Sequence, residues 1–175
     1  MAIDMRAILV GETNKISLDY EFSLTESDTP FDTQIDGVVF TKPAHVVGEI
    51  VNKGGYISLI ATVSAEYDAE CARCLKPLKR SFSVDLVRTV VDEGELVNTT
   101  EDDGEDYIEL TDGKLELEEA AIEQLMMEFP TKELCSEDCK GLCPKCGHDL
   151  NEGECGCVKK EIDPRLAILQ KLLEK

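Results

Sequence analysis

Six of the eight cysteines in this chain lie between residues 135 and 157, and the other two form a separate Cys-x-x-Cys pair. Two thiolates separated by two residues can hold one metal ion, and tetrahedral Zn²⁺ takes four such ligands, usually as two pairs. Four pairs are present, so the cysteines predict two complete Cys₄ zinc sites, or at least one. The cysteines are Cys71, Cys74, Cys135, Cys139, Cys143, Cys146, Cys155 and Cys157.

Loop length favours one way of combining these pairs. Cys143 and Cys146 lie close to Cys155 and Cys157 in the chain, so bringing the four together costs little chain entropy. The remaining four, from residues 71–74 and 135–139, would form a second site that clamps the tail of the chain to an earlier segment. The alternatives are an unliganded Cys71/Cys74 pair, a single site drawn mainly from residues 135–146, and His148 in place of one thiolate.

Other uses of cysteine are less favoured. The opening residues MAIDMRAILVGE contain no long apolar segment and no small-residue cleavage site, so we expect a cytoplasmic protein with reduced thiols rather than a disulfide framework. Thiol redox chemistry expects a thioredoxin-like βαβ context, which the pattern does not suggest. An iron–sulfur cluster stays an alternative, because Cys₄ sets hold both kinds of centre.

We expect a non-catalytic protein. Zinc held by four thiolates has no open position and activates no water. The sequence shows no Ser-His-Asp signature, no HExxH motif and no glycine-rich phosphate loop. An RNA-processing nuclease is kept as a less favoured alternative.

Composition limits the partners. The 175 residues fit one domain, or one domain with a small metal-held appendage, and no apolar run is long enough for a transmembrane helix. With 37 acidic and 18 basic residues, the formal charge is −19. That charge disfavours broad binding to nucleic acid and suits a basic protein partner. No oligomeric state is predicted.

Alternating apolar residues predict an antiparallel sheet. Strands are expected over 16–24, 34–41 and 80–91, and a hairpin over 45–67 turns at Gly54-Gly55. The Cys71/Cys74 pair would then lie in a connection between two strands. A sheet of this kind could also curl into a barrel.

The rest of the chain predicts two helices and an α+β fold. A hairpin closed by Asp112-Gly113 is expected over 107–117, and one helical face over 118–129. Residues 92–106 carry eight acids and no base, typical of a solvated, mobile loop. A second helix over 164–173 would dock on this protein or on a partner. The expected organisation is a sheet domain over 1–130 and a zinc-binding segment with its helix over 131–175.

Basic side chains flank the cysteines and offer a contact for RNA or another partner. They would meet on one surface if the tail is clamped as proposed; the alternative is scattered solubilising charge. They are Arg73, Lys76, Lys79, Arg80, Lys140 and Lys145.

The order of these motifs resembles the large ribosomal RNA subunit accumulation protein family, YceD, over roughly residues 30–175. The matching motifs are Cys71-Ala-Arg-Cys74-Leu75, Cys135-x₃-Cys139-x-Gly-Leu-Cys143-x₂-Cys146-Gly147, Leu150-Asn151, Cys155-x-Cys157 and Asp163-Pro-Arg-Leu166. The resemblance implies a cytoplasmic bacterial protein, with relatives in chloroplasts, that is needed for accumulation or processing of 23S ribosomal RNA. Large-subunit rRNA or a basic ribosomal protein would be the partner. A general protein-interaction module is the alternative function.

Overall fold

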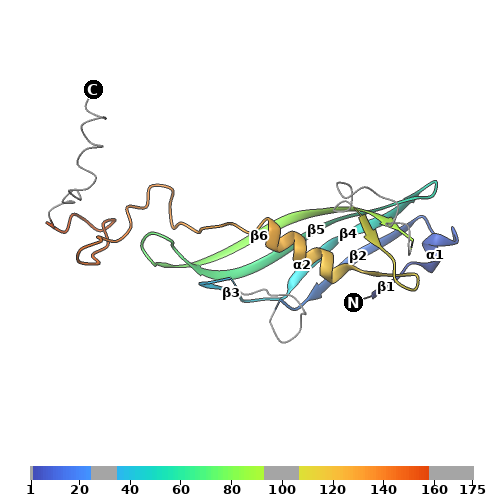
Figure 1. Cartoon of the computed structure of the whole chain (residues 1–175), viewed down its shortest axis with the longest axis horizontal. Helices are drawn as coiled ribbons and strands as arrows, with labels where there is room; N and C mark the ends of the chain where they lie inside the picture. The colour runs from blue at the N-terminus through green and yellow to red at the C-terminus, as the bar shows by residue number, and fades with distance from the viewer. Residues whose placement is uncertain (1, 25–34, 93–106, 158–175) are drawn as a thin grey trace, which may run out of the picture.

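The structure, a computed structural model, describes residues 2–24, 35–92 and 107–157. Strands form most of this part of the chain, and two helices accompany them (Figure 1). In chain order the elements are β1 (Ala2–Asp4), α1 (Arg6–Leu9), β2 (Lys15–Phe22), β3 (Val38–Phe40), β4 (Ala44–Lys53), β5 (Tyr56–Glu70), β6 (Pro77–Val91), β7 (Tyr107–Glu109), β8 (Lys114–Glu116) and α2 (Leu117–Met127).

Two antiparallel hairpins that share β5 form the centre of the main sheet. The turn between β4 and β5 contains Gly54 and Gly55, both at positive φ, as the paired glycines predicted. β5 and β6 are each fifteen residues long and pair from Ile57↔Val90 to Glu70↔Pro77. Every odd-numbered residue of β5 from Ile57 to Ala69 is buried, so the predicted alternation is confirmed.

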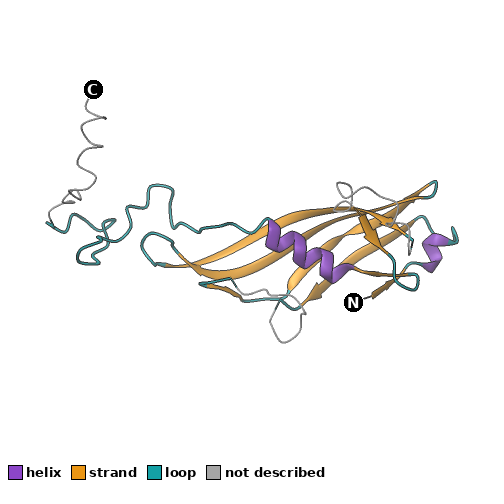
Figure 2. Cartoon of the chain, in the orientation of Figure 1, coloured by secondary structure: helices purple, strands orange, loops and turns teal. Residues whose placement is uncertain are grey.

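The sheet is open, and the prediction that it could curl into a barrel is wrong. Its strand order is β2-β4-β5-β6-β7, with β3 on the end of β5, and the edge strands β2 and β7 do not pair with each other. β7 covers only Thr89–Val91 of β6 before the chain continues into β8 and α2. That helix covers the face that a barrel would enclose (Figure 2), so the apolar face is buried without closure of the sheet.

The hairpin predicted over 107–117 forms only its turn. Thr111 and Lys114 exchange backbone hydrogen bonds of 2.9 and 3.0 Å, with Asp112 and Gly113 at positive φ between them. The flanking strands separate instead of pairing. β7 runs parallel to β6, and β8 pairs with β1 near the start of the chain.

The predicted helix over 118–129 is confirmed as α2, which ends two residues earlier. Ile122 and Leu125 on its inner face are buried. Phe129 lies beyond the helix and packs its ring on Tyr67, with a centroid distance of 4.9 Å, and on Phe82, at 5.1 Å. This aromatic group closes the end of the core that is nearer to Cys71.

Two predictions fall wholly or largely outside the described residues: the acidic loop over 92–106 and the C-terminal helix over 164–173. Of the strand predicted over 34–41, only Val38–Phe40 forms, as β3, because residues 36 and 37 form a turn in which Gly37 has positive φ. In the part of the chain that the structure describes, no helix is long and apolar enough to cross a membrane.

Candidate metal centres

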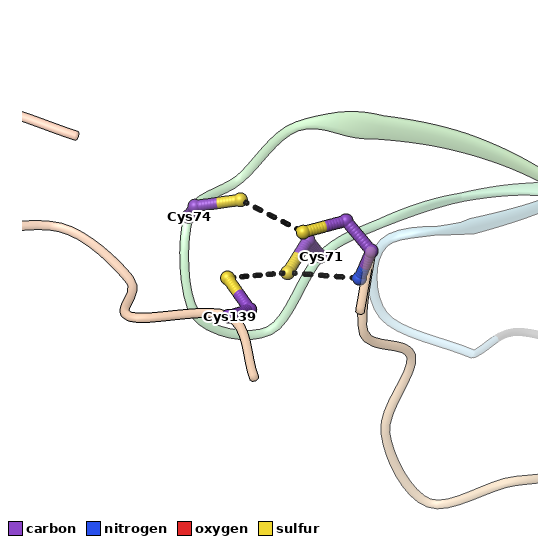
Figure 3. A group of neighbouring side chains, drawn as sticks. Cys71, Cys74 and Cys139 are labelled. Carbon is purple, nitrogen blue, oxygen red and sulfur yellow. Dashed lines mark hydrogen bonds between the residues drawn. The ribbon is translucent and has the colours of Figure 1, made fainter. Parts of the chain in front are cut away.

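Four cysteines meet where the segment after α2 passes the turn between β5 and β6 (Figure 1). All four Sγ atoms lie within 4.8 Å of one another. Figure 3 shows Cys71 and Cys74 on the loop of the hairpin and Cys139 on the segment opposite, with their sulfur atoms turned inward. We call this group the clamp tetrad, which comprises Cys71, Cys74, Cys135 and Cys139.

A second group lies further along the same segment. The Sγ atoms of its four cysteines also lie within 4.8 Å of one another. We call this group the tail tetrad, which comprises Cys143, Cys146, Cys155 and Cys157. The two groups are the ones that loop length favoured, and His148 belongs to neither. Each tetrad could hold a metal ion.

Both Cys-x-x-Cys pairs form the same turn. The N–H of Leu75 donates to the Cys71 carbonyl, and the N–H of Gly147 donates to the Cys143 carbonyl, each at 2.9 Å. Both donor residues have positive φ, 60° for Leu75 and 74° for Gly147. Glycine adopts this conformation without a steric penalty, whereas Leu75 is an unusual residue for it. The turn holds the two sulfur atoms of each pair on the same side of the loop.

In the clamp tetrad, hydrogen bonds lower the pKa of two thiols, Cys71 and Cys139. Burial opposes ionisation of Cys71, but hydrogen bonds from the backbone of Arg73 and Cys135 lower the pKa of Cys71 to about 6. The N–H of Cys135 lies 3.4 Å from that sulfur. The side-chain amide of Asn151 lies 3.4 Å from the Cys139 sulfur and is the main reason why the pKa of Cys139 is also lowered.

The pKa values of the other two thiols of this tetrad, Cys74 and Cys135, are raised. A hydrogen bond from the Lys76 backbone would lower the pKa of Cys74, yet burial and the neighbouring sulfur atoms raise it to about 12. The pKa of Cys135 is raised, chiefly by its hydrogen bond to Cys139. The surroundings of the four sulfur atoms therefore do not favour loss of all four protons, and a divalent cation that displaced the remaining protons would be bound by all four.

The sulfur positions fit one tetrahedral ion. Four sulfur atoms about 2.3 Å from a central zinc ion would stand about 3.8 Å apart. The Sγ atoms of Cys71 and Cys139 are 3.8 Å apart, and those of Cys74 and Cys135 are 3.6 Å apart. These distances are far longer than a disulfide bond, and all eight cysteines, each within the described residues, are free thiols.

In the tail tetrad, which is more exposed, the pKa of one thiol is lowered and the pKa of another is raised. Hydrogen bonds from the backbone of Lys145 and Cys146 lower the pKa of Cys143 to about 6. Hydrogen bonds with the sulfur atoms of Cys146 and Cys155 raise the pKa of Cys157 to about 12. Cys143 is buried, whereas Cys146 is exposed.

Glu133 adds hydrogen bonds between the tail and the sheet that involve no cysteine of the clamp tetrad. Its carboxylate accepts hydrogen bonds from the Tyr67 hydroxyl at 2.6 Å and from Arg80 Nε at 3.1 Å, and its carbonyl accepts from the N–H of Ala72 at 2.8 Å. Burial and the bond to Glu133 raise the pKa of Tyr67, so its hydroxyl stays a donor. Sequence reasoning missed this residue, because nothing marks one acid among 37 whose partner lies 66 positions away.

Replacing Glu133 by alanine should lower the free energy of unfolding by about 2 kcal/mol, because it leaves the Tyr67 hydroxyl and Arg80 without their shared acceptor. Urea denaturation of the metal-loaded protein measures this loss. The matched control is Glu137→Ala, since Glu137 is exposed and, among the described residues, only its backbone carbonyl takes part in a hydrogen bond, from Arg73. Equal midpoints for the two variants would contradict the role given to Glu133.

Two of the six basic side chains predicted to contact RNA or a partner form hydrogen bonds inside the protein. Nη1 of Arg73 donates to the carbonyl of Cys139 at 2.7 Å, and Nη2 of Arg80 donates to the carbonyl of Leu134 at 2.8 Å. Gly141 approaches the same loop so closely that a Cβ atom would lie 2.9 Å from the Arg73 carbonyl oxygen. The four lysines of the set, Lys76, Lys79, Lys140 and Lys145, are exposed, and so is Arg73.

Comparison with known proteins identifies relatives of the chain. Residues 59–173 match the family model described as "Large ribosomal RNA subunit accumulation protein YceD". An uncharacterised protein of Mycobacterium tuberculosis is 35% identical over 126 residues, which cover 71% of this chain and 58% of the relative. The chain therefore spans little more than half of that relative's length.

More distant relatives extend the range of organisms. YlbN of Bacillus subtilis, also uncharacterised, is 28% identical over 135 residues, which cover 76% of each protein. The "Large ribosomal RNA subunit accumulation protein YCED homolog 1, chloroplastic" of Arabidopsis thaliana is 25% identical over 158 residues, which cover 76% of this chain and 49% of the homolog. No solved structure matches the chain. Because the family model covers both Cys-x-x-Cys pairs and most of the chain, this protein belongs to the YceD family.

Proposed function

We propose that each tetrad binds one Zn²⁺ ion and that both ions are structural. All eight ligands are thiolates, which suit zinc, and four of them leave no coordination position for water or substrate. The sulfur separations of 3.6 and 3.8 Å support a single ion. An iron–sulfur cluster would separate cysteines bound to different iron atoms by more than the 4.8 Å within which all four sulfur atoms of each tetrad lie.

The function that we infer is non-catalytic support of large ribosomal subunit biogenesis in the cytoplasm, through accumulation or processing of 23S ribosomal RNA. Membership of the YceD family is the observation that carries this inference, together with the printed name of the Arabidopsis homolog. The two closed cysteine tetrads favour a scaffold over a nuclease.

A basic ribosomal protein is the partner that the surface favours over bare RNA. A cleft of about 980 Å³ lies between α2 and the strands β7 and β8. Four acidic residues line it together with apolar residues such as Ile108 and Met127; the acids are Glu109, Glu116, Glu119 and Glu123. Among the described residues that line the cleft, Arg88 is the one cation, and its guanidinium donates to Gln124 at 2.7 Å. Such a surface attracts lysine- and arginine-rich segments and repels phosphates.

Deleting the gene should lower the ratio of 23S to 16S ribosomal RNA in the cell, and the wild-type gene should restore it. The double variant Glu119→Lys/Glu123→Lys should fail to restore the ratio, because it reverses the charge of the cleft. Lys76→Glu/Lys79→Glu tests the RNA alternative at the exposed lysines. Ribosomal RNA is measured by electrophoresis, with protein levels matched by immunoblot.

Glu12→Lys/Glu21→Lys serves as the control, since it changes the net charge as much as the cleft variant does, at two exposed positions outside the cleft. If only Lys76→Glu/Lys79→Glu fails to restore the ratio, RNA is favoured as the partner over a basic protein. An unchanged ratio after gene deletion contradicts the proposed function. Cleavage of precursor 23S RNA by the purified protein would contradict the non-catalytic assignment.

A further inference from the structure

Asn151 belongs to one cysteine tetrad by sequence and to the other by contact. It lies between Cys146 and Cys155, inside the loop that the tail tetrad closes. Its side-chain Nδ2, however, lies 3.4 Å from Sγ of Cys139, a member of the clamp tetrad. A residue whose position depends on the tail loop therefore contacts a ligand atom of the clamp.

The Asn151 amide is held in one orientation by its other contacts. Its Oδ1 accepts a hydrogen bond from the N–H of Lys140 at 2.8 Å, which directs Nδ2 toward the sulfur. The Asp149 carboxylate accepts from both the backbone N–H and Nδ2 of Asn151, at 2.9 and 2.7 Å. A donor fixed in this way stabilises a thiolate and disfavours the protonated thiol.

Backbone hydrogen bonds join the two tetrads into one unit. The N–H of Leu150 donates to the Gly141 carbonyl at 2.9 Å, and the N–H of Cys143 donates to the His148 carbonyl at 2.8 Å. Leu142, between them, donates its N–H to the Arg73 carbonyl at 3.0 Å, so the same segment is fastened to the clamp loop. A displacement of the tail loop would therefore change the surroundings of the clamp.

The tail loop has little apolar packing of its own. Residues 151–154 are exposed, and Cys155 and Cys157 are half-buried. A loop without a core depends on its metal for order, as small zinc modules do. The placement of Asn151 against Cys139 thus depends on whether the tail tetrad is loaded.

We propose that Asn151 is a positioning residue that couples the two metal sites, so that zinc in the tail tetrad increases the zinc affinity of the clamp tetrad. This inference rests on the proposed zinc sites. The coupling is reciprocal, so a loaded clamp strengthens zinc binding in the tail tetrad by the same factor. Removal of a hydrogen bond to a metal ligand commonly lowers affinity by about 10- to 100-fold.

The test measures zinc affinity of the clamp by competition with a chromophoric chelator in four proteins. These are the wild type, Asn151→Ala, the tail-tetrad variant Cys155→Ser/Cys157→Ser, and the combination of the three substitutions. Loss of Asn151 and loss of the tail tetrad should each lower clamp affinity about 10-fold, and the combination should lower it no further. Absorption of Co²⁺ in the same proteins reports whether the clamp keeps four thiolates.

Two further substitutions test whether the Asn151 amide itself affects the zinc affinity of the clamp tetrad. Asn151→Asp keeps an acceptor for the Lys140 N–H but sets a carboxylate against the Cys139 thiolate, so it should lower clamp affinity more than Asn151→Ala does. Glu152→Ala, at the neighbouring exposed residue, should leave the affinity unchanged. Unchanged affinity in Asn151→Ala, or losses that multiply in the combination, would overturn the coupling while leaving the zinc sites intact. A wild type that binds fewer than two ions would instead overturn the zinc assignment, and the coupling with it.

Discussion

Replacing Cys71 and Cys74 by serine is expected to lower the zinc content from two ions per chain to one and to free the segment after residue 131 from the sheet. The clamp tetrad joins ligands that lie more than 60 positions apart, as the pair Cys74 and Cys135 shows. Structural zinc contributes about 10–16 kcal/mol of apparent binding free energy, far more than the few hydrogen bonds around Glu133. The proposed zinc ion would therefore supply most of the free energy that holds the tail in place.

Elemental analysis with thiol titration measures the first effect, and limited trypsin digestion measures the second. Cleavage after Lys132, which is exposed, should be at least about tenfold faster in this variant, since proteolysis follows the population of the released segment. Cys155→Ser/Cys157→Ser is the matched control. At saturating zinc it also loses one ion but should keep the wild-type cleavage rate after Lys132. Two ions in the Cys71→Ser/Cys74→Ser variant, or equal cleavage in both variants, would show that the clamp is not a metal site.

Replacing Gly48 by alanine should lower the free energy of unfolding by about 3 kcal/mol. Gly48 of β4 pairs with Ala61 of β5 and with Leu18 of β2. An added Cβ would lie 2.3 Å from the Ile60 carbonyl oxygen and 2.4 Å from the Ala61 Cα. Both are backbone atoms that no side-chain rotation can move, so β4 and β5 would have to separate at the centre of the sheet.

Urea denaturation followed by far-ultraviolet circular dichroism, in excess zinc, measures the effect on the sheet. Val47→Ala is the matched control, because Val47 neighbours Gly48 but is half-exposed on the opposite face. That substitution should change the free energy of unfolding by less than about 0.5 kcal/mol. A Gly48→Ala protein as stable as Val47→Ala would contradict the close approach of β4 and β5 at Gly48.

Local patterns were enough to predict the main strands and helix α2, but not the short helix α1. The alternation from Ile57 to Tyr67 and the helical spacing of Ile122 and Leu125 depend on residues close in the chain, and each pattern matches one backbone period. The position of the Cys71/Cys74 pair followed from the same signals, because a loop between two predicted strands needs no long-range information.

Features that depend on distant partners were missed. The turn at Asp112-Gly113 was predicted, but its flanking strands pair with β1 and β6 instead of with each other. The open sheet could not be distinguished from a barrel, because closure depends on where α2 packs. Arg73 and Arg80, which were predicted as contacts for RNA or a partner, also donate hydrogen bonds to carbonyl groups of the tail, and no local pattern indicates these bonds.

The sequence by itself determined the ligand types, their four pairs and the favoured grouping into tetrads, because a thiolate's affinity for metal and the entropy of closing a short loop are local properties. Only the tertiary structure decided how those pairs are supported. It brings Glu133 to Tyr67, and Asn151 to Cys139, at hydrogen-bonding distance. A side-chain hydrogen bond extends over only about 3 Å. Such contacts therefore depend on the path of the whole chain, which no spacing of residues along the sequence encodes.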